Sequence, residues 1–285
     1  MAFALLASAV IAPLSADARS TKERILAQKS VTIGIHNRIP WGYRDPSGNV
    51  ASLQPAIIRA ALAPLGVTDI KFVIGEFSTM IPGLLAQRFD MTAAGVAITP
   101  ARCASVIFSE TDLTSGDGLL VAAGNPLKIH SFEDIKRNSA IRLGGGRGSE
   151  NAKHAVQAGV PAPQMHLFQD VESTISALVA KRVDAVIMSA ATIVATLQDP
   201  NIKGVERAVP FKGLIDSEGN EVALYTAIAF RPTDTDLRDL YNEQLKKLKE
   251  SGQLEKIILE TGFTKDNLPP NKTAAQLCAA AVPSK

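Results

Sequence analysis

The stretch from Asp90 to Cys103, DMTAAGVAITPARC, contains the residue whose chemistry is most informative, Arg102. Met91 to Val96 is small, apolar and uncharged, which predicts a strand covered on both faces. Thr99 is suited to cap a following helix and Pro100 to occupy its first position, so Arg102 falls in the first turn. The helix dipole disfavours a cation there. The position therefore indicates either an anionic ligand just beyond the strand or a nearby carboxylate partner.

A glycine-rich run, Gly144 to Ser149, follows a predicted strand at 141–143 and opens a helix predicted to reach Val156. The run matches neither the GxGxxG pattern nor a Walker A loop, which argues against nucleotide binding. Free backbone N–H groups at Gly148 and Ser149 would suit a small anion, although a plain strand-to-helix turn has the same appearance.

Two aromatic residues stand just after predicted strands. Trp41, the only tryptophan, lies in a loop beside Pro40 and Tyr43, and Phe77 precedes Ser78, the predicted cap of the next helix. Loop aromatics of this kind stack on a ligand or a cation, or they pack at the edge of the fold, and both interpretations stay open.

The chain offers little for catalysis or metal binding. Its four histidines show no metal-ligand spacing, and no HExxH or GxSxG motif occurs. We therefore expect no metal, no cofactor and no catalytic residue. A net charge of +2 without a dense Lys/Arg stripe argues against nucleic-acid binding.

The elements around these residues alternate between strand and helix. Val31–Ile35 and Ile70–Ile74 read as strands, and Pro55–Leu65 as a helix, which predicts an α/β fold with a parallel sheet. The pattern at Leu85–Met91, a helix end, a basic residue, an aspartate and an apolar strand, recurs at Val179–Ala185. With 285 residues, the chain is long enough for two lobes of similar build.

Residues 1–18 resemble a secretory signal peptide. Phe3 to Leu14 is apolar, and Ala16-Asp17-Ala18 fits a cleavage site, although no Lys or Arg precedes the apolar run. An N-terminal core helix is the alternative. For an exported protein that begins near Arg19, Cys103 and Cys278 form one disulfide or remain two free thiols.

Several stretches together resemble the family 3 extracellular solute-binding proteins, the polar amino-acid and opine receptors of ABC importers. The resemblance extends from about Ser30 to Pro269 and is carried by Ile81–Leu84, Arg88–Asp90, Ala93–Cys103 and Phe108–Glu110, with Gly95 inside the central motif.

The resemblance implies roles for individual residues. Arg102 would grip a ligand carboxylate bidentately, and the helix start at Gly148 and Ser149 would grip the same group. Trp41 and Phe77 would sandwich the rest of the ligand. The other candidate ligand-binding residues are Gly95, Ala97, Ser189 and Arg38. No covalent chemistry is implied.

Three positions depart from the receptors of this family. Amino-acid receptors place an aspartate for the ligand ammonium where this chain has Ser189, so a standard α-amino acid would lose a bond of about 1.5–3 kcal/mol. The ectoine and hydroxyectoine receptors resemble the chain more closely, and their tail resembles Thr273–Cys278, which favours the disulfide. These receptors carry an acidic residue at the position where this chain has Arg38, and an aromatic residue where this chain has Ala97. We therefore expect a carboxylated, dicarboxylated or opine-like ligand rather than ectoine.

The resemblance implies a type II periplasmic binding protein with two α/β lobes joined by a two-segment hinge. The extended segments Gly118–Ala122 and Val222–Phe230 mark the boundaries: residues 19–117 and 223–285 in lobe 1, residues 118–222 in lobe 2. Such a monomer would close on its ligand in the periplasm and dock on an ABC permease in the inner membrane.

Two rival functions share this fold. An exported dehydratase of the cyclohexadienyl type would need an acid in the cleft, and Glu150 is the one candidate, although a carboxylate at a helix start is favourable by itself. A ligand-sensing module for a receptor would use the same closure as a transport protein.

Overall fold

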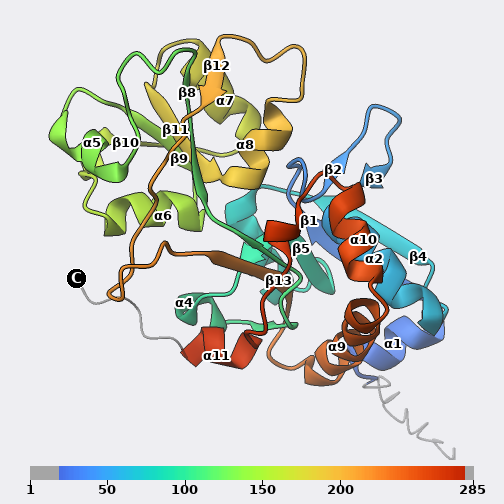
Figure 1. Ribbon diagram of the computed structural model, residues 1–285. Coiled ribbons are helices and arrows are strands. Elements are labelled where there is room, and N and C mark those ends of the chain that lie inside the picture. Colours follow the sequence, from blue (N-terminus) through green and yellow to red (C-terminus); the bar gives the residue numbers. More distant parts are fainter. Residues whose placement is uncertain (1–18, 280–285) are drawn as a thin grey trace, which may run out of the picture.

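The structure is a computed structural model that describes residues 19–279. The predicted signal peptide, residues 1–18, lies outside the described residues. Two β-sheets, each with its own helices, form two lobes (Figure 1). This arrangement confirms the predicted α/β fold.

The first sheet has the strand order β4-β1-β5-β13-β6, and β7 also pairs with β13. Strand β1 is parallel to β4 and β5, whereas β13 is antiparallel to β5, β6 and β7. The strands of this first sheet are β1 (Ser30–Ile35), β4 (Asp69–Ile74), β5 (Met91–Ala97), β6 (Ile107–Phe108), β7 (Leu113–Ser115) and β13 (Leu224–Phe230).

The second sheet has the order β10-β9-β11-β8-β12. Strands β9, β10 and β11 are parallel, and β8 is antiparallel to both β11 and β12. Its strands are β8 (Asp117–Ala122), β9 (Leu143–Gly146), β10 (Met165–Phe168), β11 (Ala185–Ser189) and β12 (Val205–Arg207). A small hairpin, β2 (Tyr43–Arg44) and β3 (Val50–Ala51), belongs to neither sheet.

Helices cover both sheets (Figure 1). With the first sheet lie α1 (Thr21–Gln28), α2 (Leu53–Leu62), α3 (Met80–Leu85), α4 (Pro100–Cys103), α9 (Thr235–Glu250), α10 (Gln253–Glu260) and α11 (Ala274–Ala279). With the second lie α5 (Phe132–Arg137), α6 (Glu150–Gln157), α7 (Val171–Val179) and α8 (Ala190–Thr196). Within residues 19–279, no helix combines the length and the apolar character that crossing a bilayer requires.

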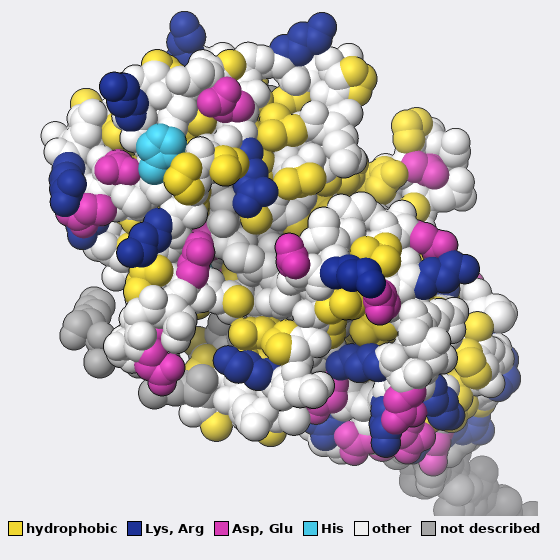
Figure 2. Space-filling view, in the orientation of Figure 1, with side chains coloured by type: hydrophobic (Ala, Val, Ile, Leu, Met, Phe, Trp, Pro, Cys, Tyr) yellow, Lys and Arg dark blue, Asp and Glu magenta, His cyan; other side chains and the backbone are white. Residues whose placement is uncertain are grey.

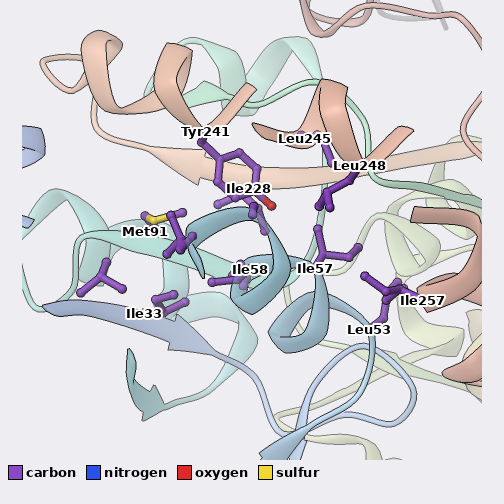
Figure 3. Close-up of a cluster of buried hydrophobic side chains, with 14 of the residues drawn as sticks. Ile33, Leu53, Ile57, Ile58, Met91, Ile228, Tyr241, Leu245, Leu248 and Ile257 are labelled. Carbon is purple, nitrogen blue, oxygen red and sulfur yellow. The ribbon is translucent and has the colours of Figure 1, made fainter. Parts of the chain in front are cut away.

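The core of lobe 1 forms around α2, because its apolar residues recur at helical spacing. Ile57 and Ile58 are fully buried. Figure 3 shows Ile57 opposite Leu245 and Leu248 of α9, and Ile58 on the side of Ile33 and Met91 in the sheet. Burial of these side chains fixes α2 between the sheet and α9, and α2 in turn places Gln54 within hydrogen-bond distance of Gly95.

The central strand and the helix after it form as predicted. Every residue of β5 is buried, and the Thr99 hydroxyl accepts a hydrogen bond from the Arg102 N–H at 3.3 Å. The predicted helix cap at Ser78 is wrong. A 3₁₀ turn at Phe77–Thr79 precedes α3, and Thr79 is the N-cap residue of α3. Strand β9 also lies later than predicted and includes Gly144, Gly145 and Gly146.

The tail crosses back to the start of the Arg102 helix. Cys103 and Cys278 form a disulfide with their Cα atoms 5.7 Å apart, so the prediction of one disulfide is confirmed. The segment after Pro269 includes helix α11, which packs against α4.

Candidate ligand-binding site

Two small cavities of about 20 and 30 Å³ lie between the lobes and share the lining residues Arg38, Phe77, Ser149 and Asn151. We call them the Arg102 cavity and the His36 cavity. The Arg102 cavity is also lined by Trp41, Gly95, Ala97, Arg102, Ser115, Glu150, Ser189, Leu224 and Thr226. Eight of the nine residues that the sequence assigned to ligand binding therefore line one cavity, and the ninth, Gly148, contacts Arg102.

Arg102 is buried and points across the cleft. Its Nη1 donates to the Ala97 carbonyl at 2.8 Å, and its Nη2 donates to the Gly148 carbonyl at 3.0 Å. Nη2 also forms an ion pair with Oε1 of Glu150 at 3.1 Å. Burial lowers the pKa of Arg102, and the Glu150 carboxylate partly offsets that shift. The structure thus contains the carboxylate partner that the sequence left open.

Arg38 lies in the same cavity as a second cation. Its guanidinium stacks on the rings of Trp41 and Phe77, 5.1 and 5.7 Å from their centroids, and its Nη2 donates to the Ala94 carbonyl at 3.2 Å. Burial, and then the charge of Arg102, lower the pKa of Arg38 to about 10. The Nε of Arg38 is buried and has no hydrogen-bond partner among the described residues. Arg38 remains charged at neutral pH and has unused donor capacity.

The two predicted aromatics differ in their roles. Phe77 contacts both cations, since the guanidinium of Arg102 lies 5.5 Å from its centroid. Trp41 is only 2% exposed and packs edge-on against Phe263. Its indole N–H donates to the Thr192 hydroxyl in lobe 2 at 3.1 Å, so Trp41 also joins the lobes.

A buried polar network supports the floor of the cavity at Gly95. The Gly95 N–H donates to Oε1 of Gln54 at 2.7 Å, and Nε2 of Gln54 donates to Asp112 at 2.7 Å. Thr226 also donates to Asp112, at 2.6 Å. Burial raises the pKa of the Asp112 carboxyl, although the two side-chain hydrogen bonds oppose this. Ala97 lies two residues further along β5 and contributes only a methyl group to the cavity wall.

The start of α6 differs from the sequence expectation. The Ser149 N–H is not free, because it donates to the Gly146 carbonyl at 3.1 Å, and the Ser149 hydroxyl caps α6. Gly148, at a φ of 75°, presents its carbonyl oxygen to Arg102. Ser189 ends β11 at the cavity wall and hydrogen-bonds the Thr192 hydroxyl at 2.7 Å.

Asn151 and His36 are among the cavity residues that sequence reasoning did not propose as ligand contacts. Asn151 is 4% exposed and lines both cavities, and His36 lines the second one. Burial, and then the charge of Arg38, lower the pKa of His36 to about 4. Two sequence signals could have indicated these residues: His36 directly follows a predicted strand, and Asn151 lies at the start of a predicted helix. In the part of the chain that the structure describes, no three His, Cys, Asp or Glu side chains gather as a metal site.

A known protein family matches most of the chain. The sequence model of the bacterial extracellular solute-binding proteins, family 3, matches residues 31–260. The chain belongs to this family. The resemblance inferred from the Arg102 motif is therefore confirmed.

Three similar proteins illustrate what members of this family bind or are named for. A probable amino-acid ABC transporter periplasmic-binding protein of Sinorhizobium fredii is 35% identical over 263 residues, 91% of this chain and 86% of the relative. The crystal structure of EhuB in complex with hydroxyectoine superimposes with a TM-score of 0.82 at 31% identity, covering 92% of this chain and 98% of EhuB. An ancestral arginine-binding protein bound to arginine reaches a TM-score of 0.71 at 27% identity, over 83% and 99% of the two chains.

Proposed function

We propose that this chain is the solute-binding component of an ABC importer and that it captures a small solute carrying two anionic groups. The names of its relatives support the importer and a periplasmic location. They also favour binding over catalysis, since the Sinorhizobium fredii relative is named as a binding protein. We expect a monomer that docks on an inner-membrane permease.

The observation that carries the ligand class is the charge of the Arg102 cavity. Arg38 and Arg102 both line it, and Glu150 is the one carboxylate among its lining residues. A buried site with two guanidinium groups and one carboxylate favours an anionic ligand, because an unpaired buried charge is strongly unfavourable. Arg38 and Arg102 each grip one anionic group in this proposal, between walls formed by Trp41 and Phe77.

Closure of two lobes is the proposed capture step. We assign residues 19–117 and 223–285 to lobe 1 and residues 118–222 to lobe 2. The change of sheet between β7 and β8, and the return at β13, support these boundaries. Ligand contacts from both lobes, Arg102 on one side and Ser149 and Ser189 on the other, would favour the closed form.

Ectoine is a poor fit to this cavity, although EhuB binds hydroxyectoine. The ring of ectoine carries a delocalised positive charge beside its carboxylate. Arg38 would lie against that charge, since it is stacked on the two aromatic walls and remains protonated. We therefore place the second anionic group of the ligand at Arg38.

Thermal unfolding of refolded mature protein tests the proposal with glutarate, butyrate and ectoine. Saturating glutarate, at a hundred times its dissociation constant, should stabilise by about 2.7 kcal/mol, a shift of a few degrees. Arg102→Gln should abolish this shift, and Arg38→Gln should remove the preference for glutarate over butyrate. Arg44→Gln, on the exposed hairpin, is the matched control. Stabilisation by ectoine but not by glutarate would contradict the proposal.

A further inference from the structure

Glu150 is the buried carboxylate that lines the Arg102 cavity together with Arg38 and Arg102. Only 8% of its surface is exposed, and it forms ion pairs with Arg102 at 3.1 Å and with Lys153 at 2.7 Å. Both ion pairs use the same oxygen, Oε1. No hydrogen bond to the other oxygen, Oε2, occurs among the described residues. Glu150 therefore keeps an acceptor for a donor group that enters the cavity.

The neighbouring Asn151 presents a second acceptor. Its Nδ2 donates to Oδ1 of Asp117 at 2.6 Å, and the other oxygen of Asp117 is bonded to Nδ1 of His154 at 2.8 Å. A carboxylate can only accept, so this bond fixes the orientation of the amide. The carbonyl oxygen of Asn151 is left without a hydrogen bond among the described residues, and Asn151 lines both cavities.

We propose that Glu150 and Asn151 form a subsite for a protonated nitrogen of the ligand. This inference rests on the proposed function, because it adds a cationic group to the dianionic solute. Glu150 would supply the counter-charge that Ser189 cannot provide at the end of β11, and the Asn151 carbonyl would supply a second acceptor. The ligand class is then a dicarboxylate with a protonated amine between its carboxylates, as in an imino-diacid.

The spacing of the charges suits such a ligand. Arg102 and Glu150 are 3.1 Å apart, so a carboxylate on Arg102 and a nitrogen on Glu150 must be close neighbours in the ligand. A carboxylate and an amine joined through one carbon meet this requirement. The second carboxylate of an imino-diacid extends from the far side of the nitrogen, toward Arg38. A ligand with two negative charges and one positive charge also complements two arginines and one glutamate.

A merely structural role for Glu150 is the competing explanation. A carboxylate in the first turn of α6 is favourable there, and Lys153 pairs with it one turn along the helix. Glu172 provides a matched control, since it is also acidic and lies in the first turn of α7 in the same lobe. It lies outside both the Arg102 and the His36 cavities.

Isothermal titration calorimetry with iminodiacetate and glutarate tests the subsite, because the two probes differ only by a protonated NH in place of a methylene. Wild-type protein should bind iminodiacetate about ten times more tightly, since a charge-assisted hydrogen bond has about this effect on affinity. Glu150→Gln should abolish the preference by weakening iminodiacetate alone. Asn151→Ala should reduce the preference by a smaller factor, and Glu172→Gln should leave it unchanged.

The outcomes separate the two proposals. If wild-type protein binds glutarate as tightly as iminodiacetate, the subsite is wrong but the dianion site stands. The same conclusion follows if Glu150→Gln weakens the binding of both probes equally, because Glu150 would then only stabilise the structure of the site. If neither probe binds wild-type protein, the dianion proposal fails, and the subsite fails with it.

Discussion

The indole N–H of Trp41 donates a hydrogen bond to the Thr192 hydroxyl at 3.1 Å, and the two residues come from different lobes. Thr192 is fully buried as the third residue of α8 and also hydrogen-bonds Ser189. The contact joins the aromatic wall of the cavity to lobe 2. Ala191, next to Thr192, packs against the core of lobe 1 and extends the same interface.

Thr192→Val should weaken ligand binding although Thr192 itself does not line the Arg102 cavity. Valine has the shape of threonine but lacks the hydroxyl. The variant would therefore lack the hydrogen bond from the Trp41 N–H, which joins the two lobes in the closed form. One buried hydrogen bond contributes about 1 kcal/mol, which corresponds to a roughly five-fold weaker affinity. Calorimetry with the tightest probe measures the change. Thr196→Val, one turn along α8, is the control, and an equal loss in that variant would contradict the explanation.

Gly95→Ala should disrupt the cavity more than a glycine substitution elsewhere. Gly95 has a φ of 63°, and an added Cβ would lie 2.5 Å from Nη2 of Arg38 and 2.7 Å from the Trp41 ring. Gly48→Ala controls for backbone strain, since Gly48 has a φ of 88° and no heavy atom within 4 Å of its added Cβ. We expect Gly95→Ala to lower the free energy of unfolding by about 1–3 kcal/mol and to abolish probe binding.

Chemical denaturation of both variants checks this prediction. In Gly48→Ala, only backbone strain should lower the free energy of unfolding, by about 1 kcal/mol, and the variant should bind the probe as wild type does. Equal losses of stability in the two variants, with binding retained in Gly95→Ala, would contradict the proposed contact of Gly95 with Arg38 and Trp41.

Local sequence signals predicted the elements around Arg102 because their causes are local. Thr99 and Pro100 define a helix start within one turn, and the uncharged run of β5 is sufficient to predict burial. The Arg102–Glu150 ion pair has no such signal, since the two residues lie in different lobes and meet only when the lobes come together. Sequence alone therefore left a ligand and a carboxylate partner as alternatives.

The glycine-rich strand β9 shows why another prediction shifted. Glycine has low strand propensity, so Gly144–Gly146 reads as a loop. In the fold these residues pair with β10, and Gly144 and Gly145 also pair with β11. An added Cβ on Gly145 would lie 3.1 Å from the Ala152 side chain. The close approach of α6 to the sheet explains the glycine, and this tertiary contact is invisible in the local sequence.

Reduction of the Cys103–Cys278 disulfide should destabilise the protein while leaving most of its binding. The bond joins residues 175 positions apart and ties α11 to α4. Its loss should lower the free energy of unfolding by about 2–4 kcal/mol. Arg102 lies beside Cys103 but is also held by the Ala97 and Gly148 carbonyls, so affinity should change by less than about three-fold.

Thermal unfolding with and without a reductant measures the effect of the disulfide. The double variant Cys103→Ser/Cys278→Ser should unfold at the temperature of the reduced wild type and should not respond to the reductant. A wild-type protein that is insensitive to the reductant under unfolding conditions would argue against the bond.

His36 should make stability depend on pH below neutrality. Burial and Arg38 lower the pKa of His36 to about 4, and its Nδ1 contacts the Gly75 carbonyl at 3.1 Å. The unfolded chain, with an ordinary pKa of 6.5, binds a proton between pH 6.5 and 4 that the folded chain rejects. Stability therefore falls as the pH drops through this window, by up to about 3 kcal/mol.

Urea denaturation at pH 7 and pH 4.5 tests this dependence with His36→Asn, whose amide can replace the bond to Gly75. The variant should lose about 2–3 kcal/mol less than wild type between the two pH values, because it has no proton to bind. His166→Asn, at an exposed position, should keep the wild-type difference. If His36→Asn retains the full wild-type slope, the acid sensitivity comes from another group, and His36 is not held neutral by the cavity.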